Sequence, residues 1–331
     1  MRKRMDKTLF LVTVFLSLFG LLMIYSSSSI WASYKFQDSF HYLKYQSVFF
    51  ALGIFLMFVI SRIPYQFYYR YANVFLIISF VLLVLVLIPG IGSVRNGSRS
   101  WFGIGSFGIQ PSEACKISIL IFSCRYLTKS QSYIQSYFKG VFPLLGIVLV
   151  FFGLIMLQPD LGTGFILFVS ILAVLFISGV DLRFFLFGGI VGVIGIVLLI
   201  IIAPYRLARI TSFMNPWSDP LGTGFQIIQS LYAIGPGGIL GLGYLQSVQK
   251  HFYLPEPQTD FIFSVIAEEF GVLGAFLVVG LFFLLLYRSI HISNHSPDLF
   301  GKLLSFGIIF QIIFQAVLNL MVVVGLIPVT G

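Results

Sequence analysis

Charged residues are scarce in this chain of 331 residues, since Asp, Glu, Lys and Arg make up 9% of it and hydrophobic residues 58%. A soluble domain carries about one quarter charged residues, so the composition excludes that class. Apolar runs of about 20 residues, long enough to cross a bilayer as helix, recur along the whole sequence. Because the backbone must satisfy its own hydrogen bonds in lipid, these runs predict an all-α, polytopic membrane helix bundle.

Cysteine and histidine are also rare, with two Cys and four His in the chain. Cys115 and Cys124 fall on one predicted helix, about 13 Å apart along its axis, which is too far for a disulfide. The histidines are scattered, and no Cys/His cluster has zinc spacing, so we expect no structural metal site. The net charge of +9 comes from residues in loops and at helix ends, which favours a membrane and an anionic lipid over nucleic acid.

Nine membrane spans are predicted, over about residues 8–28, 44–62, 70–89, 112–128, 142–157, 163–180, 184–204, 260–287 and 303–325. An N-terminus in the cytoplasm places more Lys and Arg inside than outside, as the positive-inside rule favours. We treat residues 1–331 as a single domain in the cell membrane. Its large extracytoplasmic loop covers about 204–259, and the stretch 225–234 has the apolar spacing of a surface helix.

The loop between the third and fourth spans, residues 95–116, combines cations, glycines and an aromatic residue. Arg99 beside Trp101 could hold a phosphate and a sugar, because guanidinium binds phosphate in a bidentate manner and an aromatic face stacks on a sugar. The alternative is a tight turn with an interfacial Trp and a snorkelling Arg. Glu113 and Lys116 share a helix face and are expected to face the bundle interior or its wet mouth. They serve either substrate binding or only a mutual salt bridge that stabilises the helix end.

Further polar residues lie in the other outer connections. Asp160, in QPDLGT, is either a turn residue before a helix or a substrate ligand. Arg206, Arg209 and Lys250 bring cations to the outer membrane surface, which predicts an anionic ligand there. Five glycines between residues 235 and 243 either allow close backbone approach to a ligand and offer N–H groups to anions, or form a flexible lid.

The stretch YLPEPQTDFIFSVIAEEFG, residues 253–271, carries the main candidate for catalysis. Its prolines exclude helix up to about residue 258, so Thr259 is expected to cap a helix with Asp260 in its first turn. A carboxylate at the membrane surface, flanked by cations, suits a general base for an alcohol nucleophile. The alternative is a carboxylate that only interacts with the helix dipole.

Two more carboxylates follow on the same predicted helix. Asp260, Ser264 and Glu268 share one face, with Glu268 about 12 Å deeper in the bilayer. We expect Glu268 and Glu269 to be buried hydrogen-bond anchors between helices rather than catalytic groups.

Taken together, these motifs resemble the SEDS family (shape, elongation, division and sporulation), which includes RodA, FtsW and SpoVE. The matching segments cover most of the chain in family order: NGSRSW (96–101), IQPSE..K (109–116), QPDLGT (158–163), RI.SF.NPW.DP.G.GFQ..QSL.AIG.GG (209–238), QK..YLPEPQTDFIF...AEE.G (249–271) and GLIPVTG (325–331). Within the family, the wording of NGSRSW and YLPEPQTDFIF is most similar to the SpoVE/FtsW branch of spore-forming Gram-positive bacteria.

The resemblance implies a ten-helix glycosyltransferase that polymerises lipid II into glycan strands, in sporulation, division or elongation, and releases undecaprenyl diphosphate. It also implies a class B penicillin-binding protein as partner. Asp260 matches the family's essential aspartate and would deprotonate the acceptor 4-hydroxyl. Arg99 and Lys116 match family cations and would stabilise the departing diphosphate, alone or with a divalent cation, Mg²⁺ or Mn²⁺.

The sequence departs from the family pattern in two places. Family members continue past VTG into a Pro-Phe-x-Ser-Tyr-Gly-Gly-Ser segment and a tenth helix, so we expect this chain to be a fragment or a truncated product. Leu245 stands where a glycine is usual.

Two other functions stay open: a flippase for lipid II, which needs polar groups across the full membrane depth, and an inactive scaffold for a transpeptidase. The outer position of Asp260 and most motif cations favours polymerisation.

Overall fold

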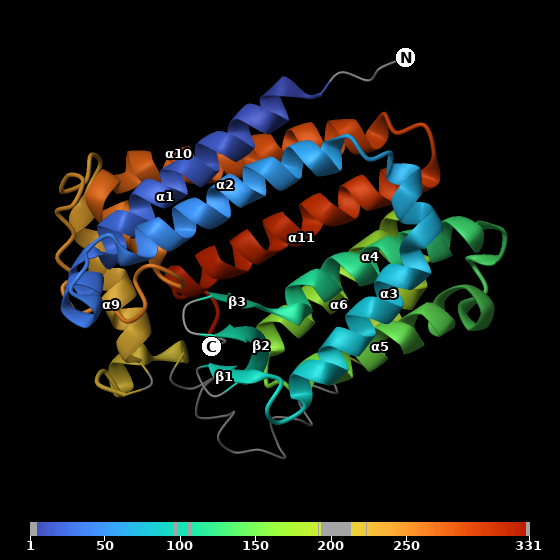
Figure 1. The fold of residues 1–331 in the computed structure, drawn as a ribbon, viewed down its shortest axis with the longest axis horizontal. Helices are drawn as coiled ribbons and strands as arrows, with labels where there is room; N and C mark the ends of the chain where they lie inside the picture. Colours follow the sequence, from blue (N-terminus) through green and yellow to red (C-terminus); the bar gives the residue numbers. More distant parts are fainter. Residues whose placement is uncertain are drawn as a thin grey trace. The chain divides into compact units, whose positions relative to one another are not determined.

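A computed structural model describes residues 5–95, 98–104, 107–190, 192, 213–222 and 224–328. Apart from a small three-stranded sheet, the regular elements of this part of the chain are helices (Figure 1). The predicted all-α helix-bundle class is therefore confirmed. The chain divides into two compact units, which are described separately here.

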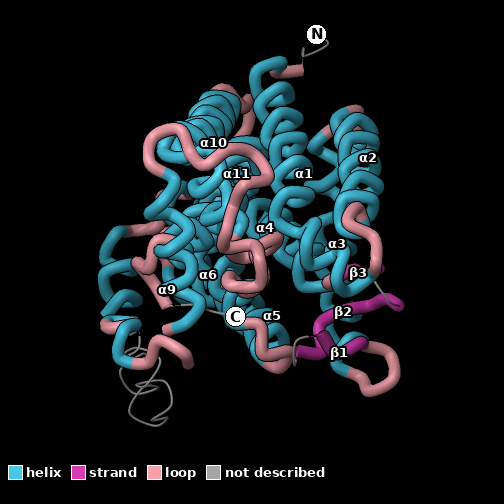
Figure 2. The backbone as a smooth tube through the Cα atoms, turned by 90° about the vertical axis from the view of Figure 1, so that its left-hand side faces the viewer, coloured by secondary structure: helices cyan, strands magenta, loops and turns pink. Residues whose placement is uncertain are grey.

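The first unit comprises Met1–Arg62, Ile194–Arg288 and Ala316–Val329. It contains α1 (Lys7–Phe36), α2 (His41–Ser61), the short helices η3 (Pro216–Ser218) and η4 (Gly235–Gly237), α9 (Phe225–Ile234), most of α10 (Ile262–Asn294) and the end of α11 (Leu299–Val323). Helices α1 and α2 form an antiparallel pair that lies side by side in both views (Figures 1 and 2). A buried apolar cluster that includes Met23, Phe261, Val265 and Val323 forms its core.

The second unit comprises Ile63–Val193, Ser289–Gln315 and Thr330–Gly331. It contains α3 (Tyr65–Leu87), β1 (Ser93–Arg95), β2 (Ser98–Ile104), β3 (Phe107–Ile109), α4 (Pro111–Lys129), η1 (Gln131–Tyr133), η2 (Tyr137–Val141), α5 (Phe142–Met156), α6 (Leu161–Ile177) and the first part of α11. The strands form an antiparallel meander, with Val94 opposite Arg99 and Gly103 opposite Gly108. Leu83, Ile119 and Leu167 belong to a large buried core that joins its helices.

Each predicted span except 184–204, most of which lies outside the described residues, corresponds to a helix. Among the described helices, six are long and apolar enough to cross a membrane, so the number of nine spans stays a prediction. Helix α1 continues well past the predicted end at residue 28. The serines there are compatible with helix, because the hydroxyls of Ser27 and Ser28 donate hydrogen bonds to the carbonyls of Met23 and Ile24 at 2.8 and 2.6 Å.

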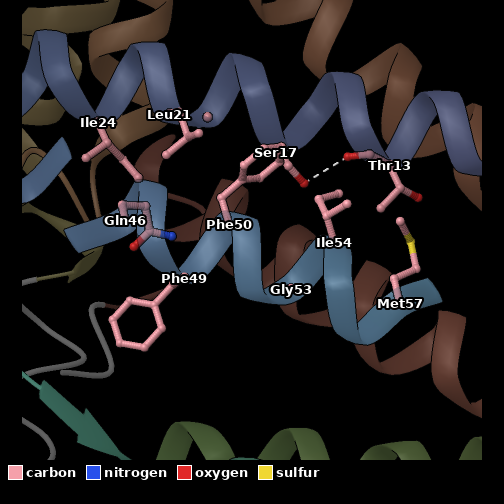
Figure 3. A pocket seen from close by; sticks show the side chains of 11 residues that line it. Thr13, Ser17, Leu21, Ile24, Gln46, Phe49, Phe50, Gly53, Ile54 and Met57 are labelled. Atoms are coloured by element: carbon pink, nitrogen blue, oxygen red, sulfur yellow. Dashed lines mark hydrogen bonds between the residues drawn. The ribbon is translucent and has the colours of Figure 1, made fainter. Parts of the chain in front are cut away.

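A groove of about 450 Å³ runs between α1 and α2 (Figure 3). Its polar lining residues are Thr13, Ser17 and Gln46, and the hydroxyls of Thr13 and Ser17 are hydrogen-bonded to backbone carbonyls of their own helix. No ionisable side chain is among the residues that line the groove. None of the predicted site residues lines it either, so the chemistry must be sought elsewhere.

The start of α1 provides a first testable contact. Asp6 caps the helix by accepting a hydrogen bond from the Leu9 amide at 2.8 Å, and its other carboxylate oxygen accepts one from Arg288 of α10. The Arg288 hydrogen bond, followed by the Leu9 amide, lowers the pKa of Asp6 below 3.8. The stabilisation is therefore complete above the ordinary pKa of an aspartate, and it is lost as pH falls through the lowered value.

We expect Asp6→Ala to reduce the free energy of unfolding by about 1 kcal/mol, because both the helix cap and the ion pair are lost. Asp6→Asn is the matched control, since asparagine also caps helices and only the ion pair is removed. Thermal unfolding of the purified variants in one detergent measures the difference. An alanine variant as stable as wild type would show that neither contact contributes.

Candidate active site

Asp260 lies in a turn just before α10, which begins at Ile262. The expected position in the first helical turn is corrected by this placement. Thr259 does not cap the helix, because it lies three residues before the first helical residue; its hydroxyl instead donates to the Glu256 carbonyl at 3.3 Å. The first helical carbonyl is instead that of Phe261, which accepts from the Ser264 amide at 3.0 Å. Phe261 is 1% exposed, so its burial fixes where the helix starts and leaves Asp260 outside it.

The carboxylate of Asp260 is exposed but only partly hydrated. The residue is exposed at the surface, but the protein around it removes some of the water that would solvate the charge, and this raises the pKa of Asp260 above 3.8. No hydrogen bond or ion pair to Asp260 is made by the described residues. The group is therefore free to accept a proton and is a stronger base than an ordinary aspartate.

Helix α10 is broken close to this site. Gly271 has φ 61° and ψ −158°, which is not helical and which favours glycine. Residues 264–269, before the break, are all buried, whereas Val272, Leu273 and Phe276 after it are exposed. The half-helix that follows Asp260 is thus part of the core of the first unit, whereas the remainder of α10 contributes Val278 to that core and presents other apolar side chains outward.

A glycine-rich loop supplies the backbone partners that the break in α10 requires. The amides of Leu242 and Gly243 donate to the carbonyls of Glu268 and Glu269 at 2.9 and 3.0 Å. In return, the amides of Val272 and Leu273 donate to the carbonyls of residues 238 and 239 at 2.9 and 3.2 Å. The predicted close backbone approach is real, but it is made to the protein's own helix rather than to a ligand.

Only glycine fits at the contacts between this loop and the helix. A Cβ atom on Gly241 would lie 2.2 Å from the carbonyl oxygen of Glu269, and one on Gly237 would lie 2.1 Å from that of Ala267. These clashes involve backbone atoms and cannot be relieved by a side-chain rotation. Because the loop is held on both sides of Gly271, it is a fixed brace and not a free anion-binding nest.

Lys250 and Glu269 form a buried ion pair beneath this brace. The Lys250 ammonium lies 2.8 Å from the Glu269 carboxylate, and the side chains are 2% and 0% exposed. Ser26 of α1 completes the group, because its hydroxyl lies 2.6 and 2.7 Å from the two carboxylate oxygens and accepts from Lys250 at 3.2 Å. Lys250 is therefore buried in the protein and paired with Glu269 rather than exposed, and its predicted depth at the outer membrane surface stays a prediction.

Glu268 is buried beside this pair and is held by the chain segment before Lys250. One of its carboxylate oxygens accepts from the Ser247 hydroxyl at 2.6 Å, and the other accepts from the Val248 and Gln249 amides at 2.8 and 3.4 Å. Both glutamates thus act as internal anchors, in agreement with the structural role predicted for them. Asp260 is the acid of the 260–269 segment that is left for chemistry.

In the second unit, Arg99 and Trp101 lie on β2 and share one face, since side chains alternate along a strand. The Arg99 guanidinium donates to the Leu87 carbonyl at 3.5 Å, and its Nε atom is buried without a partner among the described residues. The side-chain amide of Gln158 is likewise buried and unpaired within the described ranges, while the backbone carbonyl of Gln158 accepts from the Ser98 hydroxyl. Unpaired buried polar groups near β2 are consistent with a polar ligand or water there.

Lys116 of α4 is also largely engaged inside the second unit. It is 4% exposed, and its ammonium lies 3.0 Å from the carboxylate of Glu113 and 3.0 Å from the side-chain oxygen of Gln315 on α11. The salt bridge that the sequence predicted as one alternative is therefore present. The Glu113 side chain is 50% exposed, so the pair lies at the boundary of the buried region, and substrate binding by either residue stays a prediction.

Asp160 has both carboxylate oxygens engaged. One accepts from the Thr163 amide at 3.0 Å, which caps α6, and the other accepts from the Gln110 side chain at 2.8 Å. The structure thus shows the helix-capping role that was the alternative to substrate binding. Arg206 and Arg209 lie outside the described residues, so their predicted role is not placed by the structure.

Sequence reasoning identified the acids and cations of this region but missed most of their partners. Ser26, Ser247 and Gln315 come from segments far from the residues they bind, and nothing in the sequence around these polar residues identifies their partners. A signal was available for Ser26, since an unbroken run of serines inside a predicted span is unusual. The strands around Arg99 were also missed, because glycine-rich segments carry little strand pattern.

Comparisons with known proteins identify one family over nearly the whole chain. Residues 6–331 match the family profile of FtsW, RodA and SpoVE, described as cell cycle proteins. Stage V sporulation protein E of Bacillus subtilis (strain 168) is 50% identical over 326 residues, which is 98% of this chain and 89% of that protein. A probable peptidoglycan glycosyltransferase FtsW of Trichlorobacter lovleyi is 41% identical over 326 residues, 98% of this chain and 86% of that protein.

Solved structures show the same fold. A chain from a peptidoglycan synthase complex that coordinates polymerization and crosslinking matches with a TM-score of 0.81 at 32% identity, over 98% of this chain and 89% of that one. A mutant of the rod shape determining protein RodA from Thermus thermophilus matches with a TM-score of 0.71 at 27% identity, over 98% and 88%.

Proposed function

Because the chain belongs to the FtsW, RodA and SpoVE family of cell cycle proteins, we propose that it is a multi-pass membrane peptidoglycan glycosyltransferase that polymerises lipid II. Relatives that bear the name peptidoglycan glycosyltransferase cover nearly the whole chain. The observation that carries the proposal is the state of Asp260: its carboxylate is unpaired within the described residues and has a raised pKa, whereas Glu268 and Glu269 are engaged internally.

In the proposed reaction, Asp260 removes the proton from the 4-hydroxyl of the acceptor GlcNAc. The hydroxyl oxygen attacks C1 of the donor sugar and forms the new glycosidic bond. The bond from C1 to the diphosphate breaks, and undecaprenyl diphosphate leaves with the electron pair. The proton stays on Asp260 until water removes it. Arg99 and Lys116 are proposed to offset the negative charge that develops on the diphosphate.

A divalent cation such as Mg²⁺ or Mn²⁺ would assist the departure of a diphosphate. Within the ranges that the structure describes, no group of three or more His, Cys, Asp or Glu side chains could hold a metal ion. Because Mg²⁺ is commonly held by one or two carboxylates together with substrate phosphates, the diphosphate of lipid II would supply the main ligands of such an ion. The proposed steps use only side chains of the chain itself.

We place the N-terminus in the cytoplasm and Asp260 on the outer side, where the positive-inside rule puts them. The proposed partner is a class B penicillin-binding protein that cross-links the strands. It is supported by the similarity to a chain from a complex that coordinates polymerization and crosslinking.

The test of the proposed function is a reconstituted assay with labelled lipid II. The purified protein and its penicillin-binding partner are incubated with the substrate, and glycan strands are resolved on a gel. We expect a ladder of strands. A protein that moves lipid II across vesicle membranes but forms no strands would instead be a flippase, and the proposal would fail.

The proposed base also predicts a pH dependence. A protonated Asp260 cannot accept the hydroxyl proton, so activity must fall as pH drops through its pKa. Because partial desolvation raises that pKa above 3.8, we expect the acidic limb of the pH–rate profile to lie at higher pH than for an ordinary aspartate. Initial rates of strand formation measured against pH, with lipid II binding measured at each pH, provide the test. A rate that stays constant down to the ordinary aspartate pKa would contradict the assignment.

A further inference from the structure

We propose that the Lys250–Glu269 ion pair is a clasp that positions Asp260 for the reaction, so that Lys250, Glu269 and Ser26 are positioning residues. This inference rests on the proposed function. We call residues 250–269 the Asp260 hairpin, because the ion pair joins its two ends at 2.8 Å. Asp260 lies near the middle of this segment, ten residues from one end and nine from the other, in the turn between its loop half and α10.

The loop half of this hairpin, residues 251–259, is anchored to the core by Leu254, which is 2% exposed, but its backbone is strained on both sides of that anchor. His251, Phe252 and Tyr253 are exposed, and Phe252 and Glu256 have φ values of 67° and 45°, which non-glycine residues rarely adopt. The Leu254 amide donates to the Gln249 carbonyl at 2.9 Å. Strained backbone of this kind persists only when the surrounding contacts hold it, and the paired ends supply part of that restraint.

The clasp fixes those ends through three parts of the chain. Lys250 comes from the loop, Glu269 from the half-helix of α10 and Ser26 from α1, and all three are buried. The neighbouring contacts of Glu268 with the Ser247 hydroxyl and the Val248 amide hold the same loop segment against α10. Buried charges contribute to stability only with close partners, so the main value of such a pair is to specify one arrangement.

The charges of the clasp are not available for a ligand. The Lys250 ammonium is occupied by Glu269 and Ser26, and its side chain is 2% exposed. Its effect on catalysis must therefore be transmitted through the hairpin to Asp260. A displacement of a catalytic group by about 1 Å can reduce a rate by about 100-fold, so loosening the ends of the hairpin is sufficient to abolish efficient proton transfer.

The experiment compares Lys250→Met, Glu269→Gln and the double variant Lys250→Met/Glu269→Gln in the reconstituted lipid II assay. Each single variant leaves a buried group without its partner, so we expect a lower Tm and about 100-fold lower kcat. The double variant removes both charges, so we expect Tm to recover. Its kcat should stay low, because the hairpin is still unclasped. Recovery of kcat together with Tm would show a purely stabilising pair and overturn the proposal.

Hydrogen exchange provides a readout that does not depend on activity. In the double variant we expect at least about tenfold faster exchange of the amides in 242–260, with little change in α2. Lys44→Met is the matched control, because Lys44 forms an ion pair with Asp38 at 2.7 Å whose side chains are 67% and 34% exposed. Unchanged exchange in 242–260 would refute the clasp, whereas loosened exchange in a protein that forms no strands even as wild type would refute only the proposed function.

Discussion

Replacing Asp260 with asparagine is expected to reduce the rate of strand formation by about 100- to 10,000-fold, which is the usual contribution of a general base. Asparagine has nearly the same size as aspartate but cannot accept the hydroxyl proton. The loss should appear in kcat rather than in KM, because the carboxylate acts in the transition state and need not bind the substrate. Initial rates with labelled lipid II, at several concentrations, separate the two effects.

The same substitution should leave the fold intact. Burial disfavours the ionised form of Asp260, and this raises its pKa. Above that pKa the ionised carboxylate therefore lowers the free energy of unfolding, and a neutral side chain removes this cost. We expect the Tm of Asp260→Asn at neutral pH to equal or exceed that of wild type. A variant that loses activity only because it unfolds would not support the assignment of Asp260 as the base.

Replacing Gly271 with alanine is expected to prevent the first unit from folding correctly. The residue has φ 61°, and a Cβ atom there would lie 2.5 Å from the Gly241 amide nitrogen and 2.5 Å from the Ile239 carbonyl oxygen. Backbone atoms cannot give way as a flexible side chain can, so the brace between the loop and α10 must open. Strain and lost hydrogen bonds together should cost more than about 3 kcal/mol. Yield of folded protein and Tm measure the effect.

Gly280→Ala is the matched control, because Gly280 lies on the same helix and a Cβ atom there meets nothing within 4 Å. Alanine favours helix over glycine by up to about 1 kcal/mol, so this variant should be at least as stable as wild type. Equal behaviour of the two variants would show that the break at Gly271 is not needed for the fold.

The helices could be predicted from the sequence, because a long apolar run in a membrane satisfies its backbone hydrogen bonds by forming a helix. The position of Asp260 was predicted to within one turn, since the prolines before it limit where α10 can begin. The exact start depended on the burial of Phe261, and that follows from tertiary packing. The first span was predicted to end near residue 28, but α1 continues to Phe36, because the hydroxyls of Ser27 and Ser28 find acceptors within the helix.

The role of the glycine loop could not be predicted from the sequence. A glycine-rich sequence shows that the backbone can approach another group closely, but it does not show whether that group is a phosphate or another helix. The same limit applies to Lys250, whose partner Glu269 is adjacent only after the hairpin folds back. Polar pairing over long separations is set by the fold, so sequence patterns identify the participants and the structure identifies the pairs.

The most direct test of Asp260 as the base is a comparison of wild type, Asp260→Asn and Asp38→Asn in the lipid II assay, each with the penicillin-binding partner. Asp38 is the control acid, because its carboxylate pairs with Lys44 at the surface. We predict strand ladders from wild type and Asp38→Asn, and none from Asp260→Asn although it still binds lipid II. Equal ladders from wild type and Asp260→Asn would contradict the account.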